Sequence, residues 1–508
     1  MKNFAKLLVV ALAVTIMASL FALSASAAAA PELIDPNTLT PGSERVLFIK
    51  DAPRDENHQV VGELEGDGSG SDANNPFKPI DHESFDPSAT SPKYHLQTAF
   101  YQATELLKDE GGTIVICGPV YFGLYEAYGA PGAATQDVFT AKFGENTIKI
   151  TSVYDGVDYR ETAGAKITLA LPAEIGMYGQ SIWENVDIET ADTYRVISFS
   201  NYATLIGEGV NCYPADDAFE GVAANYVSLS GGHRYSGGVD LTTNLVVKSG
   251  SYNVIAAGEW GVNSTRRYNE TDNPESGIKS SNNLDGNTYA RLVVEGTTTV
   301  YGEINGTNRQ RAEFSGQSEV TINGGNFECD INMVGSTGMV NTDGKVTLKI
   351  NGGNFANAWS INNATAGCTN NLPAVSILDF SGWTGDLAGL AYAVAVVTEF
   401  SEIKFADGLT VEKVLENYVE PTEPAESEPE ATEPEATTPT ESQPADATDP
   451  VEETEPEAST PSEGENEGED KADEKEEGGN GWILWVAIAA GVVVVAAIII
   501  VVLKKKKA

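Results

Sequence analysis

Short apolar runs recur along the chain between Gly112 and Phe400, and each ends at a glycine or an asparagine. Examples are Val227–Gly232, Leu245–Gly250 and Leu292–Gly296. Runs of four to six β-branched or aliphatic residues with this punctuation are typical of short strands joined by turns. No stretch of this region has a helical period that we would interpret as a helix. The pattern therefore predicts an all-β array.

One unit of this array occurs twice without change. The sequence Asn-Gly-Gly-Asn-Phe begins at Asn323 and again at Asn351, 28 residues later, and each copy follows a strand-like run. A strand-turn unit of this size becomes stable only when copies stack and bury a continuous apolar column. We therefore expect strands near Val320 and Val346 to be parallel neighbours, with Phe327 on Phe355. We also expect an asparagine ladder from Asn326 and Asn354, as identical amides form along a stacking axis, and tight corners at the paired glycines. An array of β-sandwiches remains the alternative, because spaced strands fit both folds.

Amphipathic segments at both ends of the array predict caps. Leu96, Ala99, Phe100 and Ala103 have helical spacing, with Ser91-Pro92 as a suitable start and Gly111 as a suitable stop. Val411, Val414, Leu415 and Tyr418 repeat this spacing at the far end. Helices at these places would cover strand edges that otherwise invite aggregation.

The opening of the chain adds a specific resemblance. It contains Gly66–Asp72, the segment Asn75-Pro-Phe-Lys-Pro-Ile80, the amphipathic segment just described, and Gly111-Gly-Thr-Ile-Val-Ile-Cys-Gly118 followed by Tyr121. This order resembles the start of pectin-lyase-like right-handed parallel β-helix proteins, and with the repeats the likeness extends over about residues 60–400. The insertion 81–93 departs from that pattern. The resemblance implies a three-sheet parallel coil, a fold that carries polysaccharide lyases, glycoside hydrolases and non-enzymatic adhesins.

The two ends predict export and anchoring. Lys2 and Lys6 precede an apolar run that ends in small residues at 25–27, as in a signal peptide. Trp482–Leu503 is 22 residues long without a charge, long enough as a helix to cross a bilayer, and four lysines follow it. We expect a single-pass protein of the cell membrane whose larger part is extracellular, of the kind displayed on bacterial surfaces. The predicted division is 1–27 signal peptide, 28–92 arm and turn segment, 93–419 capping helix and β-helix, 420–480 stalk, 482–503 membrane helix and 504–508 basic tail.

Charge narrows the class of partner. The chain has 31 basic and 74 acidic residues, a net charge of −43, which argues against nucleic acid because such a chain repels phosphates. The stretch 420–480 alone holds 23 acidic residues, two lysines and nine prolines with almost no large apolar residue. This composition predicts a disordered, extended stalk. The four cysteines form no metal-ligand spacing, and we expect core thiols.

No set of residues predicts a catalytic site. Asn341-Thr-Asp-Gly344 matches the first motif of polygalacturonase-type hydrolases, but Asp216-Asp217 and Gly232-His233 precede it, whereas in those enzymes the pair and the histidine follow. We interpret Asp343-Gly344 as a turn, and leave the catalytic residues unassigned.

Two groups of residues are candidates for binding. Trp260, Arg266 and Arg267, with His233 nearby in sequence, form a basic and aromatic cluster that suits a sugar acid and a stacked ring, or else a solvated loop. Asp67 and Asp72 are candidates for Ca²⁺, or else belong to a glycine-rich turn. Ca²⁺ is the one cofactor considered; otherwise none is expected. The sequence favours a surface-displayed β-helix that binds an extracellular glycan or a host-cell ligand, with a membrane-anchored polysaccharide lyase or glycoside hydrolase as the alternative.

Overall fold

The computed structural model describes residues 32–54, 60–86, 88, 94–122, 138–169, 174–191, 193, 195–232, 242–260, 288–307, 309, 316–334, 345–364 and 375–419. The predicted signal peptide, stalk, membrane helix and basic tail lie outside these residues. Among the helices that the structure does describe, none has the length and apolar character needed to cross a membrane.

Within the described residues, eleven strands form one parallel sheet, here called sheet 1. Its strands, in spatial order, are β1 (Val46–Ile49), β2 (Gly112–Ile116), β5 (Gly144–Thr151), β10 (Gly179–Glu184), β13 (Ala203–Ile206), β16 (Thr242–Val247), β18 (Thr288–Val294), β20 (Gly316–Ile322), β23 (Lys345–Ile350), β25 (Val375–Asp379) and β27 (Glu402–Lys404). The spatial order is also the order along the chain.

A second parallel sheet, sheet 2, is almost as long in the described part of the chain. It contains β4 (Val138–Phe139), β9 (Glu174–Gly176), β12 (Val196–Ser198), β15 (Ser228–Ser230), β17 (Ser251–Ala256), β19 (Thr299–Asn305), β22 (Asp330–Asn332), β24 (Ser360–Asn362) and β26 (Val397–Thr398), with β21 (Asn326–Phe327) beside β19. Sheet 3 is shorter and contains β3 (Val120–Phe122), β8 (Ile167–Leu169), β11 (Asp187–Thr190) and β14 (Asn211–Pro214). β6 (Val153–Tyr154) and β7 (Val157–Asp158) form an antiparallel hairpin.

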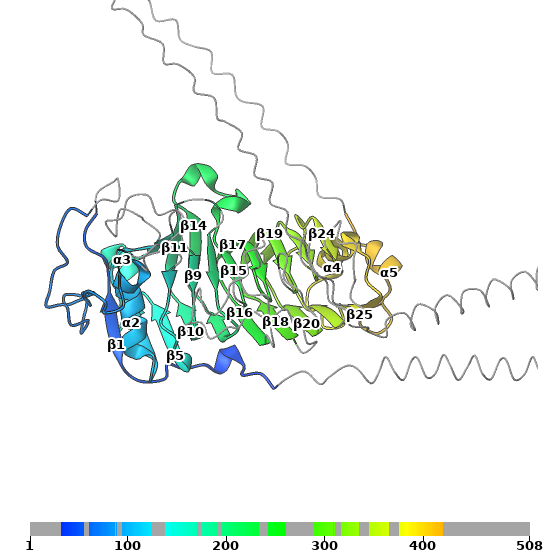
Figure 1. The fold of residues 1–508 in the computed structure, drawn as a ribbon. Coiled ribbons are helices and arrows are strands. Elements are labelled where there is room, and N and C mark those ends of the chain that lie inside the picture. The colour runs from blue at the N-terminus through cyan, green and yellow to red at the C-terminus, as the bar shows by residue number, and fades with distance from the viewer. Residues whose placement is uncertain are drawn as a thin grey trace, which may run out of the picture. The chain divides into compact units, whose positions relative to one another are not determined.

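The chain visits the sheets in turn. After β10 in sheet 1 it forms β11 in sheet 3 and β12 in sheet 2, and then returns to sheet 1 as β13, the hydrogen-bonded neighbour of β10. Figure 1 shows the strands side by side from β1 to β25, with helix α2 (Ala99–Leu107) at the first strands and helices α4 (Leu387–Ala395) and α5 (Val411–Leu415) at the last. The protein is thus all-β with long parallel sheets, as predicted, and this arrangement is compatible with a β-helix solenoid.

Columns of apolar side chains fill the space between the sheets. Each column holds one residue from each of several successive strands, at the same register position, and its members are at most 3% exposed. In sheet 1 the column is Ile114, Ile150, Trp183, Ile206, Val247, Val294, Ile322 and Ile350; in sheet 2 it is Ile175, Ile197, Leu229, Ile255, Ile304, Ile331 and Ile361. Burial of these columns is the main force that stacks one unit on the next.

The predictions made from the exact repeat are confirmed. β20 and β23 are parallel neighbours with Ile322 opposite Ile350. The rings of Phe327 and Phe355 stack with centroids 4.8 Å apart. The second glycine of each copy has a positive φ, as the corner requires (110° and 116°).

Asparagine side chains connect the two copies at their corners. Asn351 Nδ2 donates to Asn323 Oδ1 at 2.9 Å, and Asn354 Nδ2 donates to Asn326 Oδ1 at 3.4 Å. All four side chains lie near the surface, so each bond replaces a bond to water.

We therefore predict a small cost for breaking the shorter of these bonds. Asn351→Ala should lower the free energy of unfolding by about 1 kcal/mol, measured by urea denaturation. Asn326→Ala, which removes the longer bond by deleting its acceptor, is the matched control and should cost less. An equal or larger loss in the control would show that the ladder does not act through bond geometry.

Helices close both ends of the sheets. α2 (Ala99–Leu107) follows a 3₁₀ turn (Tyr94–Gln97) and begins after Thr98, whose hydroxyl accepts from Tyr101 N at 3.0 Å. The predicted start at Ser91-Pro92 lies outside the described residues. At the far end α5 (Val411–Leu415) confirms the second predicted cap, with Val414 fully buried.

The expectation that no helix interrupts the array between Gly112 and Phe400 is wrong. α3 (Tyr159–Ala163) and α4 (Leu387–Ala395) both lie in that region. α3 is only five residues long, so it has no period to detect. α4 is apolar on nearly every side, which removes the amphipathic pattern that marks a surface helix, although Asp386 caps its first turn.

The N-terminal arm belongs to the folded part. Its strand β1 pairs with β2, and the other edge of β1 is covered because Phe48 N donates to Gly70 O and Phe77 N donates to Phe48 O. Earlier in the arm, Leu39 packs on an apolar patch on sheet 1 formed by Ile182, Leu205, Val246 and Val293. The arm thus protects both a strand edge and an apolar surface from solvent.

Candidate functional site

Polar side chains line the outer face of sheet 2. Ile304, Ile331 and Ile361 point into the core, so their sequence neighbours on β19, β22 and β24 point outward. Glu303, Asp330 and Ser360 form one outward row across these three strands, and the Ser360 hydroxyl donates to Asp330 Oδ1.

A second outward row runs two residues further along the same strands. Asn362 Nδ2 donates to Asn332 Oδ1 at 3.0 Å, and the Thr398 hydroxyl donates to Asn362 Oδ1. Asn332 Nδ2 donates to Glu303 Oε1 at 2.8 Å and so joins the two rows. The result is a preorganised lattice of amide, hydroxyl and carboxylate groups on adjacent strands, about 4.8 Å apart. Asn332 is buried within it (3% exposed), whereas the side chains of Glu303, Asp330, Ser360 and Asn362 are partly exposed.

Aromatic rings flank this lattice. Tyr226 and Tyr301 pack with ring centroids 4.6 Å apart, and burial together with its neighbour Tyr226 raises the pKa of Tyr301 to about 12, so its hydroxyl remains protonated. Trp359 precedes β24 and is 61% exposed. An indole ring this exposed is unfavourable in water and adds nothing to the packing of the core. It is a flat apolar surface of the kind on which a sugar ring stacks.

Trp260 lies beside the same face but is not open to solvent. It is 7% exposed and packs on Val196 and Val254, outward residues of β12 and β17. The guanidinium of Arg309 lies over the indole, 4.2 Å from its ring centroid. The other members of the predicted cluster, Arg266, Arg267 and His233, lie outside the described residues, as does Asp343.

The two aspartates considered for Ca²⁺ hold the turn at 66–75 together. Asp67 accepts from Ser69 N at 2.8 Å, and Asp72 accepts from Asn74 N at 2.8 Å and from Asn75. These hydrogen bonds to the ionised form lower the pKa of both carboxyl groups. Across the described ranges, no group of three potential metal-ligating side chains comes together.

Three of the cysteines are buried free thiols, as expected, and Cys368 lies outside the described residues. Burial raises the pKa of Cys117 to about 11 and that of Cys212 to about 12, and that of Cys329 well above its ordinary value. Such thiols remain protonated and unreactive.

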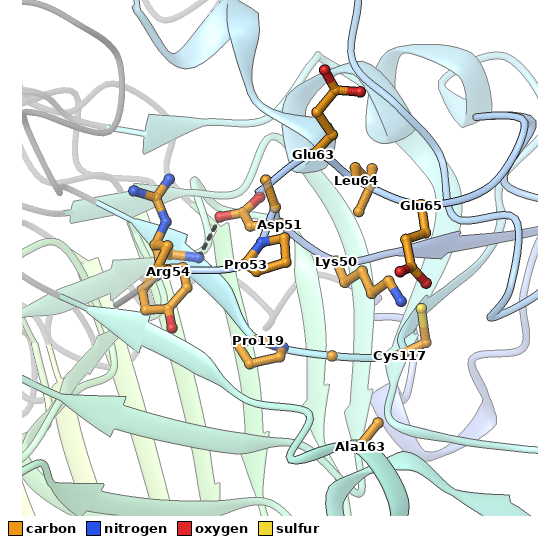
Figure 2. Close-up of a pocket in the computed structure, with 13 residues that line it drawn as sticks. Lys50, Asp51, Pro53, Arg54, Glu63, Leu64, Glu65, Cys117, Pro119 and Ala163 are labelled. Carbon is orange, nitrogen blue, oxygen red and sulfur yellow. Dashed lines mark hydrogen bonds between the residues drawn. The ribbon is translucent and has the colours of Figure 1, made fainter. Parts of the chain in front are cut away.

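A separate cavity of about 410 Å³ lies where the arm meets the start of sheet 3. Its charged and aromatic lining comprises Lys50, Asp51, Arg54, Glu63, Glu65 and Tyr121. In Figure 2 the Asp51 carboxylate and the Arg54 side chain lie on one side of the cavity, and Lys50 and Glu65 on the other. The Arg54 guanidinium lies 4.9 Å from the centroid of the Tyr121 ring.

Asp51 completes the edge of sheet 3. β3 is the edge strand, and its Tyr121 N donates to Asp51 Oδ2 at 2.8 Å, while Asp51 N donates to Pro119 O. Burial raises the pKa of Asp51 to about 6, although the bond from Tyr121 and the charge of Arg54 act in the opposite direction. A carboxyl group that titrates near neutrality inside a cavity is a frequent mark of a functional site.

Neither of these two regions was found by sequence reasoning. The outward rows come from strands in which acidic and amide residues alternate with isoleucine, a pattern that also fits an ordinary solvated strand. The cavity joins residues 50–54 and 63–65 to residues 117–119, 121 and 163, which are far apart in sequence. The one available signal was Trp359, an aromatic residue in a polar segment.

Comparison with known proteins gives no match: neither a family model, nor a curated protein, nor a solved structure is similar to this chain.

Proposed function

We propose that this protein is a cell-surface module that binds glycans through the outer face of sheet 2. In this proposal the sheets form a right-handed parallel β-helix of the pectin-lyase-like kind. The stretch 420–480 is a stalk, 482–503 is a single membrane helix, and the folded part is extracellular. The ligand is an extracellular glycan or a host-cell surface ligand, and neither a cofactor nor nucleic acid takes part.

The exposed Trp359 beside the polar lattice is the observation that carries the proposal. Sugars offer apolar ring faces and many hydroxyl groups, and they are bound by aromatic platforms with nearby amides and carboxylates. The hydrogen bonds within the lattice hold these groups in place before a ligand arrives, which lowers the entropy cost of binding. A surface of parallel strands also repeats its groups at a regular spacing, which suits a polymer.

Glycoside hydrolysis is the second candidate, favoured by one observation. Glu303 and Asp330 are register partners on adjacent strands, and carboxylates about 5–10 Å apart are the catalytic groups of glycosidases. Both carboxylates, however, accept hydrogen bonds from Asn332 and Ser360. Both groups are therefore engaged in holding the lattice together, so binding without turnover is our first proposal.

The test uses cells that display the full chain. Pectin, alginate and glycosaminoglycans with a fluorescent label would be offered with and without Ca²⁺, while reducing ends and unsaturated products are followed. We expect retention without products, and Trp359→Ala should weaken it roughly tenfold, the effect of about 1.4 kcal/mol of lost stacking.

Tyr154→Ala is the matched control for this loss. Tyr154 is also an exposed aromatic residue (38%), but it lies in the β6–β7 hairpin near the start of sheet 1, so its removal should not change retention. Sustained product formation that is abolished by Glu303→Gln would replace the binding proposal with the hydrolase. No retention of any polymer would overturn both.

A further inference from the structure

The cavity at the start of sheet 3 is independent of the proposed glycan face. It is formed by Lys50–Arg54 and Glu63–Glu65 of the arm, by the first turn of the array at Cys117–Pro119 and Tyr121, and by Ala163 at the end of α3. The glycan face lies on sheet 2, on strands β19 to β24. A ligand of the cavity would therefore not compete with a glycan for the same groups.

The lining carries both signs of charge. Lys50 and Arg54 are the cations, and Asp51, Glu63 and Glu65 are the carboxylates. A purely anionic ligand would face three carboxylates, and a purely cationic ligand would face two cations. Complementarity therefore favours a ligand that carries an ammonium and a carboxylate at different ends.

Asp51 is the group in this lining that most needs a partner. One of its carboxylate oxygens accepts from Tyr121 N, and no ion pair joins it to any residue that the structure describes. The charge of Arg54 acts on this carboxylate, and the Arg54 guanidinium lies over the Tyr121 ring. A partly buried carboxylate without an ion-pair partner gains more from a bound cation than an exposed one does, since water screens it less.

We propose that this cavity binds a small zwitterion of the peptide type, with its ammonium on Asp51 and its carboxylate toward Lys50 on the other side of the cavity. A cavity of about 410 Å³ is within the range that accommodates small ligands in proteins. Each charged end of the ligand faces a side chain of opposite charge. Removal of either charge from the ligand should therefore weaken binding.

The pairing predicts a dependence on pH. The ammonium requires ionised Asp51, whose pKa lies at about 6, so affinity should rise about tenfold from pH 5 to pH 7. A dipeptide keeps both of its own charges over this range. Of the other groups that face Asp51, burial raises the pKa of Cys117 and of Tyr121, so both remain neutral; Lys50, Arg54, Glu63 and Glu65 supply the remaining charges.

The experiment is calorimetric titration of the full chain, purified in detergent, with alanylalanine at pH 5, 6 and 7. The comparison ligands are N-acetylalanylalanine, which lacks the ammonium, and alanylalanine amide, which lacks the carboxylate. We expect the unmodified dipeptide to bind at least tenfold more tightly than either derivative at pH 7, which is the scale of one hydrogen bond to a charged group.

Two variants decide the assignment. Asp51→Asn should lower the affinity for alanylalanine about tenfold at pH 7 and abolish its pH dependence. Asp72→Asn, on the same arm but outside the cavity, should change neither. Equal binding of the acetylated dipeptide, an unchanged Asp51→Asn variant, or no heat with any ligand would overturn the proposal. The two proposals can be tested separately. Cells that display Asp51→Asn should still retain the glycan, and Trp359→Ala should still bind the dipeptide, so failure of one proposal does not imply failure of the other.

Discussion

Phe355→Ala is expected to lower the free energy of unfolding by about 3–5 kcal/mol, the usual cost of removing a large buried aromatic side chain. Phe355 is 2% exposed, stacks on Phe327 and has Trp383 on its other side, with a centroid distance of 6.4 Å. Its removal leaves a void in the column that joins three successive units. Because each unit is stabilised mainly by its neighbours, the loss should appear as earlier unfolding of the C-terminal half of the array.

Urea denaturation followed by tryptophan fluorescence measures this effect, and Trp359→Ala provides the matched control. Trp359 is four residues away and larger, but it is 61% exposed, so its removal should change stability by less than about 0.5 kcal/mol. A stability loss under 1 kcal/mol for Phe355→Ala would mean that the aromatic column does not hold the units together. In the glycan-retention assay the order should be reversed: Trp359→Ala should have the larger effect and Phe355→Ala the smaller one.

The stacking of units could be predicted because the sequence repeats itself. An identical pentapeptide 28 residues apart places identical side chains at identical corners, so the parallel pairing of β20 with β23, the phenylalanine stack and the asparagine ladder all follow from one pattern. In physical terms, each unit has an apolar face that only a copy of itself can cover.

Elements without a period could not be predicted in this way. α4 consists almost entirely of apolar residues, so its burial in the cap, rather than an amphipathic pattern, determines its structure. β1 lies in the arm, and it pairs with β2 although more than 60 residues separate the two strands. Long-range pairing of this kind leaves no local signal in the sequence.

The candidate sites likewise depend on contacts between residues that are far apart in sequence, which could not be predicted. Trp260 was chosen for its basic neighbours in sequence, yet the residue that contacts its ring is Arg309. Glu303 and Asp330 look ordinary within their own strands, and only Trp359 stands out, as an aromatic residue in a polar segment. Only the register of sheet 2 places Glu303 and Asp330 side by side on its outer face. Sites made across parallel strands depend on alignment between units, which spacing along one chain does not reveal.

Asp51→Asn is expected to stabilise the protein at neutral pH. The folded-state pKa of Asp51, about 6, is above its ordinary value of 3.8, so the folded protein binds the proton more tightly than the unfolded chain does. Its contribution to stability is therefore greatest in acid and is lost as the pH rises from about 4 through 6. Two pKa units correspond to about 3 kcal/mol, and because solvent screens part of the charge we expect about 2 kcal/mol.

The asparagine keeps an oxygen that accepts from Tyr121 N but has no charge to bury, so the variant should gain this free energy above pH 7 and almost none at pH 4. Urea denaturation at both pH values measures the difference. Asp72→Asn is the control of opposite sign, since its hydrogen bonds lower the pKa of Asp72 and its ionised form contributes stability that is lost as the pH falls. If Asp51→Asn were destabilising at pH 7, the carboxylate would already have a compensating charge in the cavity. In that case the Asp51 carboxylate would not need the ammonium group of a ligand as its partner.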